Sequence, residues 1–409
     1  MKTLAAKCLW IVLSGIFLFS PAVENPVQQI AHNVSVVNIE VAVRVYEGNR
    51  FVDNLTIDDF ELYENDIPQK IEAIYRIQKS HIVDQGPKVE PERNTVEMKT
   101  GAVEPIRSPD PKIERRVFLL YFEMEQYPSP MNAAIDYLFE NVIGENDTLL
   151  IVTPTEQWKF VIGKENADQR RELSEALKKR LKKTLRLAGS YTRELIGGLK
   201  SLMVYDDEMD EMDGMGSLLP MKVSEICDQL VAHKVLSEKR FDELAGFLKP
   251  IVGQKHVFLF YQEETYSVPF KFKSIFERKF LDRLHSIDKK RIQELFSNAQ
   301  TTVHFAFLRK DLNEKTDVEY SEANPAAPVG MSGDIFQTFR DLAITTGGIV
   351  ETTRNPRFAM QKVTTAAENY YLLYYRPAAP AAGKEFKNIK VRVKNANYKV
   401  ISRSGYFER

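Results

Sequence analysis

Four short runs of large apolar residues set the limits on what this chain can fold into. They cover residues 117–122, 148–152, 256–261 and 302–308, with longer stretches of helical pattern between them. A run that is apolar at nearly every position predicts a strand buried on both faces, as in a parallel sheet. The sequence therefore predicts an α/β fold, with a doubly wound, mostly parallel sheet and helices on both faces.

The segments between these strands predict both short strands and helices. A short strand is expected at 158–162, and Thr192 stands where the amino-terminal cap of a helix would be. The expected helices cover residues 131–142, 165–187, 193–203, 221–248, 274–299, 334–344 and 357–367.

The flanks of this α/β region have a β pattern instead. Residues 33–77 contain near-alternating β-branched residues and turn signals, and residues 369–409 contain three more strand-like runs. Residues 78–114, rich in proline and charge, predict a linker, and residues 115–368 the central domain. Because each β piece is small for independent stability, we expect the two to form one β-sandwich.

Residues 1–22 have the features of an export signal peptide. Two lysines precede an apolar run from Cys8 to Phe19, and a small-residue boundary follows at 20–22. The run is shorter than the roughly 20 residues that a membrane-spanning helix needs. We expect cleavage and a secreted or periplasmic protein with no integral membrane anchor, and an uncleaved anchor is the alternative.

Charge and motif content disfavour several classes of function. Lys and Arg number 56 against 57 Asp and Glu, so the chain has no large net field to hold nucleic acid. The sequence has no nucleophile elbow, no phosphate-binding glycine loop and no metal-ligand spacing of histidines. We expect His256, His304 and Cys227 to be structural. A protein that is not an enzyme is favoured over an exported hydrolase, although a catalytic triad can be spread through a sequence.

Four phrases, in the same order along the chain, resemble the bacterial von Willebrand factor A-related proteins. Together they span nearly the whole mature chain. The resemblance implies a von Willebrand factor A-like domain inside a sandwich-forming frame, and protein–protein recognition of the adhesion type with a protein partner. The phrases are LTIDDFELYEN with PQKI at 55–71, LAITTGG at 342–348, YYLLYYRP at 370–377 and RSGYF at 403–407.

The resemblance also implies a metal-ion-dependent adhesion site at the carboxyl ends of the sheet strands. Such a site holds Mg²⁺ through an Asp-x-Ser-x-Ser loop, a Thr on a second loop and an Asp on a third. Here Glu123 and Glu125 stand at the Asp and first Ser positions, and Thr192 stands at the Thr position. Glu263 or Glu264 replaces the third-loop Asp.

These departures leave two interpretations of the degenerate site. Each carboxylate is one methylene longer than the pattern requires, whereas Mg²⁺ demands near-ideal octahedral geometry. Either Mg²⁺ binds to Glu123, Glu125, Thr192 and Glu263, or, as we favour, no cofactor binds and the glutamates are solvated. In both cases these residues and Glu264 are expected to contact the protein partner. A structural envelope component whose A-domain edge is inert is the alternative function.

Overall fold

The structure, a computed structural model, describes most of the chain from residue 39 onward. The expected export signal and nearly all of the expected linker lie outside the described residues. The described ranges are 39–79, 81–85, 116–164, 166–209, 219–234, 238–283, 288–310, 326–330, 333–377 and 386–407.

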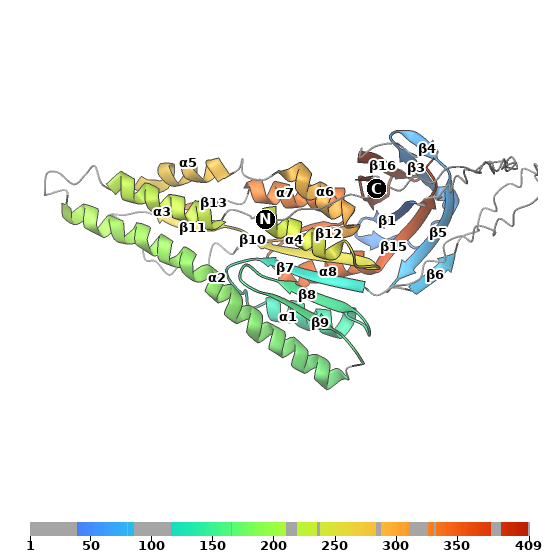
Figure 1. Ribbon diagram of the computed structural model, residues 1–409, viewed down its shortest axis with the longest axis horizontal. Helices are drawn as coiled ribbons and strands as arrows, with labels where there is room; N and C mark the ends of the chain where they lie inside the picture. Colours follow the sequence, from blue (N-terminus) through green and yellow to red (C-terminus); the bar gives the residue numbers. More distant parts are fainter. Residues whose placement is uncertain are drawn as a thin grey trace, which may run out of the picture. The chain divides into compact units, whose positions relative to one another are not determined.

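An open six-stranded sheet forms the centre of the chain (Figure 1). Its strand order is β14-β12-β10-β7-β8-β9, and of these strands only β9, at one edge, pairs antiparallel with its neighbour. The expectation of a mostly parallel sheet is confirmed. The strands are β7 (Arg116–Glu123), β8 (Thr148–Val152), β9 (Gln157–Val161), β10 (Gln254–Gln262), β12 (Thr301–Leu308) and β14 (Val350–Thr353).

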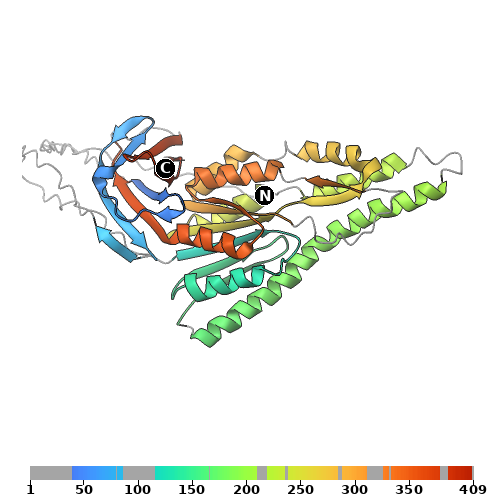
Figure 2. The ribbon, with the colours of Figure 1, turned by 180° about the vertical axis from the view of Figure 1, so that it is seen from behind.

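Helices cover both faces of this sheet because its strands are apolar on both sides. Phe118, Leu120 and Phe122 of β7 pack with α1, η2, α8 and the first half of α2 on one face. Leu119 and Tyr121 pack with α4, α6 and α7 on the other (Figures 1 and 2). The helices are α1 (Met131–Tyr137), its π-helical continuation η2 (Leu138–Val142), α2 (Ala167–Met209), α4 (Glu238–Leu248), α6 (Lys289–Asn298), α7 (Gly333–Thr345) and α8 (Pro356–Glu368).

A helical insertion with its own core is built onto the second half of α2. Figure 1 shows α3 running beside that part of α2. The buried side chains of Leu199, Cys227, Val268 and Phe276 form the centre of its core. Because β11 follows the carboxyl end of β10, the insertion adjoins that edge of the open sheet. Its elements are α3 (Leu219–Lys234), β11 (Thr265–Pro269), η3 (Phe270–Phe272), α5 (Lys273–Arg283) and β13 (Ala326–Gly330), which pairs with β11.

The amino- and carboxyl-terminal β segments build two antiparallel sheets around one core. β15 lies between β1 and β5 in the first sheet, and β16 lies between β3 and β18 in the second. Val41 and Leu373 of the first sheet pack with Leu62 and Val391 of the second, so the two segments share a sandwich. The elements are β1 (Ile39–Glu47), β2 (Arg50–Phe51), η1 (Ile57–Asp59), β3 (Phe60–Glu64), β4 (Ile67–Gln69), β5 (Ile71–Gln78), β6 (His81–Gln85), β15 (Asn369–Tyr375), β16 (Phe386–Val393), β17 (Lys399–Ser402) and β18 (Gly405–Phe407).

Several expected boundaries were wrong. α2 is one helix of 43 residues, so Thr192 lies in its middle and does not cap a second helix. Within 221–248 the structure describes α3 and α4, and within 274–299 it describes α5 and α6, with residues 235–237 and 284–287 outside the described residues. α6 has a cap of its own, because the Asp288 side chain accepts the Arg291 backbone N–H. β6 pairs with β5 and extends the sandwich into the expected linker.

Among the residues that the structure describes, no helix is both long enough and apolar enough to cross a membrane.

Candidate functional site

The carboxyl ends of β7 and β10 mark the switch point of the open sheet. The helix after β7 packs on one face, and α6, between β10 and β12, packs on the other. Open α/β sheets place their ligand sites in the crevice at such a point. Glu123 at the end of β7 lies opposite Tyr261, and the backbone N–H of Gln126 donates to Oε1 of Gln262 at 3.2 Å. The loops after the two strands therefore meet.

The carboxylate of Glu125 is the centre of the side-chain cluster at this edge. Its Oε1 accepts a hydrogen bond from the Thr192 hydroxyl at 2.5 Å and lies 2.5 Å from Nζ of Lys234. Nε2 of His233 lies 3.8 Å from the same oxygen. Glu125 and Thr192, which the sequence assigned to one site, are therefore in direct contact. The Glu125 side chain is 20% exposed, so a partner can still reach it.

Lys234 was not predicted from the sequence and is the main addition that the structure makes to the site. It is the last residue of α3, and only 8% of its side chain is exposed. Its Nζ lies 3.5 Å from Oε1 of Glu264 and 5.8 Å from the centre of the Tyr266 ring. A lysine at the end of a helix is ordinarily a solvated side chain near the negative pole of the helix dipole. Only the docking of α3 gives it a buried position between two carboxylates.

A glycine in α2 allows the Glu125 loop to approach the helix. A Cβ added at Gly189 would collide with the backbone carbonyl oxygen of Glu125. Thr192 lies about one helical turn further along α2, so the same approach brings its hydroxyl to the Glu125 carboxylate. The glycine and the threonine are evident in the sequence, but there they predicted a break in the helix.

Glu123 belongs to an adjoining part of the cluster. Its Oε2 accepts a hydrogen bond from the Tyr121 hydroxyl at 3.2 Å and lies 3.8 Å from Nη1 of Arg240. Arg240 is held in place because its Nη2 donates to the Thr153 carbonyl oxygen at 2.8 Å. Burial raises the pKa of Glu123, and the positive charges of Arg240 and Lys234 oppose that shift. Glu123 is therefore a partly buried, partnered carboxylate and not a fully solvated one.

Glu263 and Glu264 point to different partners. Oε2 of Glu263 accepts the backbone N–H of Lys310 at 3.1 Å, just beyond the end of β12, whereas Glu264 faces Lys234. Burial lowers the pKa of the Lys310 ammonium, and the nearby charges of Glu125, Glu264 and Glu263 partly restore it. Of the two candidates for the third-loop acid, Glu264 is the one that joins the Glu125 cluster directly.

As arranged, these side chains do not fit a divalent cation. Oε1 of Glu125 already receives the Thr192 hydroxyl and the Lys234 ammonium, and Glu264 faces the same ammonium. A metal ion at this position would have to displace Lys234. Within the described ranges, no group of three or more His, Cys, Asp or Glu residues is arranged to hold a metal ion.

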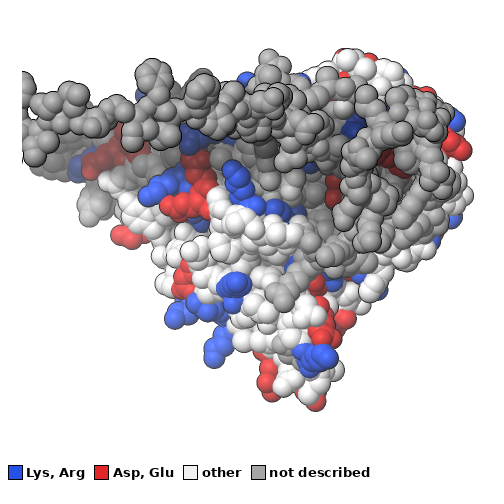
Figure 3. All heavy atoms as spheres, turned by 45° about the vertical axis from the view of Figure 1, so that its right-hand side comes forward, with Lys and Arg blue, Asp and Glu red and all other residues white. Residues whose placement is uncertain are grey.

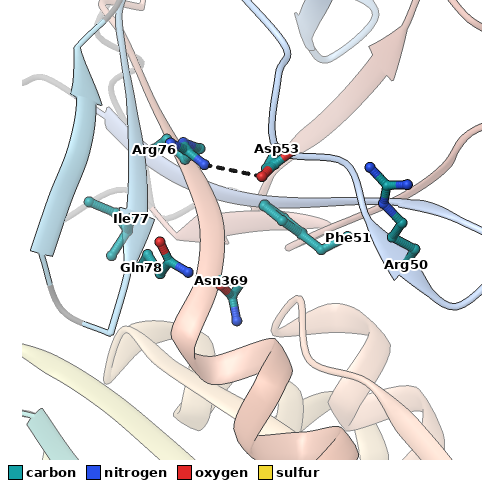
Figure 4. A pocket seen from close by; sticks show the side chains of 7 residues that line it. All are labelled: Arg50, Phe51, Asp53, Arg76, Ile77, Gln78 and Asn369. Carbon is teal, nitrogen blue, oxygen red and sulfur yellow. Dashed lines mark hydrogen bonds and ion pairs between the residues drawn. The ribbon is translucent and has the colours of Figure 1, made fainter.

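Two cavities elsewhere in the structure are lined by none of the site residues predicted from the sequence. One, of about 270 Å³, lies in the sandwich, where Arg76 and Asp53 point toward one another and form an ion pair at 3.4 Å (Figure 4). The other, of about 820 Å³, is an open groove lined by α7, α8 and the strands β16 and β17. Neither brings together groups with an evident chemical role, so the switch-point cluster is the candidate site.

The described part of the molecular surface in Figure 3 shows no segregation of charge. Lysine and arginine side chains are interspersed there with aspartate and glutamate side chains. A nucleic-acid interface would gather basic side chains on one face.

Comparison with protein families and with curated proteins finds no match to this chain. Among solved structures, two examples are similar in part. An aerotolerance-related membrane protein from Bacteroides fragilis matches 62% of this chain and 98% of its own, with 8% identity and a TM-score of 0.28. The human COPII-coat protein Sec24c matches 72% of this chain and 43% of its own, with 7% identity and a TM-score of 0.26. Strand order and cluster position define the class: a doubly wound α/β domain with a charged cluster at its switch point.

Proposed function

We propose that this chain is a non-enzymatic protein-interaction protein built on a von Willebrand factor A-type domain. Its contact site is the cluster at the carboxyl edge of the sheet, formed by Glu123, Glu125, Thr192, Glu263 and Glu264. One observation carries the proposal. Residues from three separate segments converge at the switch point, where Glu125 contacts Thr192 of α2 and shares Lys234 with Glu264.

The chemistry of the cluster favours binding over catalysis. The Thr192 hydroxyl donates to a carboxylate that is also held by an ammonium, so that carboxylate is a poor general base for activating it. The Cys227 thiol is buried in the insertion, and burial raises its pKa to about 11, which suppresses the reactive thiolate. We therefore favour an interaction protein over an exported hydrolase.

The partner is a protein that presents cationic or hydrogen-bond-donating side chains. Glu125 retains exposed surface, and each carboxylate oxygen can accept more than one hydrogen bond. A partner donor can therefore add to the contacts with Lys234 and Thr192. We also propose that the chain is exported by residues 1–22 and meets this partner in the periplasm or outside the cell.

Charge reversal at the cluster tests this function. Purified chains carrying Glu125→Lys or Glu263→Lys are compared with the wild type for capture of the same envelope protein. Glu243→Lys is the matched control, because Glu243 is 65% exposed on α4 and forms only a surface pair with Lys239. We expect the site variants to lose capture and the control to keep it. Circular dichroism must show that each variant is folded, and Glu125→Gln provides a milder change.

Equal capture by all variants would instead favour the second candidate, a structural envelope component that uses its β-sandwich. One observation supports that candidate. β6 is the end strand of the first sandwich sheet, and Val83 on it is 42% exposed. An edge strand with an exposed apolar side chain is a common place for another chain to add.

A further inference from the structure

We propose that the Lys234 ammonium is a built-in cation that takes the place of a divalent metal ion at the switch point. Its Nζ lies 2.5 Å from Oε1 of Glu125 and 3.5 Å from Oε1 of Glu264. The Thr192 hydroxyl is hydrogen-bonded to the same Glu125 oxygen. Two carboxylates from different segments thus flank one positive charge that the chain itself supplies, and a hydroxyl group from a third segment is hydrogen-bonded to one of these carboxylates.

The burial of Lys234 distinguishes this contact from an ordinary surface ion pair. Only 8% of its side chain is exposed. Surface ion pairs, in contrast, exchange readily with water and contribute little to stability. A buried ammonium is retained only where carboxylates or other acceptors replace its water shell. Conversely, removing the ammonium would leave the Glu125 and Glu264 carboxylates close together with a large part of their charge uncompensated.

The surrounding carboxylates are largely offset without any metal. Glu123, Glu125, Glu263 and Glu264 are accompanied by Lys234 and Arg240, and the Lys310 ammonium interacts with Glu125, Glu263 and Glu264 as well. A doubly charged ion added to this group would be repelled by three nearby cationic side chains. The same ion would meet much less repulsion in a chain that lacks the lysine.

The position of Lys234 depends on the docking of the insertion. α3 is anchored by Val223, Cys227 and Leu230, which pack in one core with Leu199 of α2 and Val268 of β11. That packing directs the end of α3 toward the sheet edge. The cation is thus part of the fold and does not depend on the metal content of the surroundings.

Calorimetric titration of the full chain with Mn²⁺ tests this assignment. The wild type is expected to show no saturable binding at millimolar Mn²⁺. Lys234→Met removes the ammonium but keeps an apolar stem, and it should gain one saturable site that is lost again in Lys234→Met with Glu125→Gln. Lys234→Arg keeps a cation and should bind no metal. Lys239→Met, an 84% exposed lysine on α4, is the matched control and should behave as the wild type.

A second variant covers the case in which Lys234→Met does not fold. Lys234→Gln still offers an N–H donor to Glu125, and folding of either variant upon Mn²⁺ addition counts as binding. The assignment is overturned if the wild type binds Mn²⁺ through Glu125, as shown by loss in Glu125→Gln. It is also overturned if neither Lys234→Met nor Lys234→Gln binds Mn²⁺ or is folded by it. No partner takes part, so the outcome is independent of the proposed interaction function.

Discussion

Nη1 of Arg44, on the first strand of the sandwich, donates a hydrogen bond at 2.7 Å to the carbonyl oxygen of Gly347, just after α7 of the α/β domain. Nε of the same side chain donates to the carbonyl oxygen of Ala366 in α8. The backbone N–H of Ser404 also donates to the Thr345 carbonyl oxygen at 2.9 Å. The sandwich and the α/β domain are therefore joined by buried, directional contacts.

Replacing Arg44 should weaken this junction. Arg44→Met keeps an apolar stem but removes two charge-assisted hydrogen bonds, and the carbonyl oxygens of Gly347 and Ala366 lose their donor. We expect a loss of about 2 kcal/mol in the free energy of unfolding, measured by urea denaturation. Arg50→Met, at an exposed position of the neighbouring β2, is the control and should change stability little. Equal midpoints for the two variants would contradict the role assigned to Arg44.

The buried pair of His256 and His304 should make the fold sensitive to acid. The Ile349 N–H donates to Nδ1 of His304, so His304 carries its proton on Nε2 and donates that proton to Nδ1 of His256, 3.3 Å away. Burial and the charge of Arg44 lower the pKa of both rings well below the usual value. Below about pH 6.5 the unfolded chain therefore binds more protons than the folded chain, and stability falls as the pH falls.

The loss from each of these histidines should approach about 1.4 kcal/mol per pH unit once the pH is well below 6.5. This loss is measured by urea denaturation of the wild type and of His256→Phe between neutral pH and pH 5. The variant should lose less stability on acidification. His81→Gln changes an exposed histidine and should keep the wild-type slope. An equal loss of stability per pH unit in all three proteins would contradict a neutral buried pair of histidines.

Two glycines of α2 should respond oppositely to the same substitution. Alanine is about 1 kcal/mol more favourable than glycine inside a helix. At Gly197 nothing lies within 4 Å of an added Cβ, so Gly197→Ala should stabilise the protein. At Gly189 the added Cβ would strike the Glu125 carbonyl oxygen, so Gly189→Ala should destabilise it by about 1–3 kcal/mol. Thermal denaturation compares them, and a shift of the same sign in both would contradict the close approach of the Glu125 loop.

Cys227 should be unreactive in the folded protein. Its side chain is fully buried, and burial raises the pKa of the thiol to about 11, so little thiolate is present at neutral pH. Alkylation with iodoacetamide, followed by mass spectrometry of the peptide that carries Cys227, should show modification only after urea is added. Rapid labelling in buffer would mean that α3 separates readily from the core of the insertion.

Much of the fold could be predicted because the relevant signals are local. The runs at 117–122 and 302–308 are apolar on both faces, and such runs indicate buried parallel strands wherever they occur. Residues 148–152 coincide with β8 for the same reason. Helix boundaries were harder to predict, because the glycine and threonine near residue 190 suggested a break where α2 is continuous.

The candidate site could be predicted only in part. Glu123 and Glu125 follow a recognisable strand, so their place at the sheet edge follows from topology. Lys234 is more than a hundred residues from Glu125 along the chain and reaches it only through the packing of the insertion, which no local pattern encodes. The sequence therefore indicated solvated carboxylates, whereas the structure pairs Glu125 and Glu264 with an ammonium.

The most direct test of the account is the affinity of one captured partner for the wild type and for Glu125→Gln, measured by calorimetry with a chelator present throughout. We predict tight binding to the wild type despite the chelator, and at least tenfold weaker binding to Glu125→Gln, with Glu243→Gln unchanged. Binding that Glu125→Gln leaves intact would contradict the claim that the switch-point cluster is the contact site.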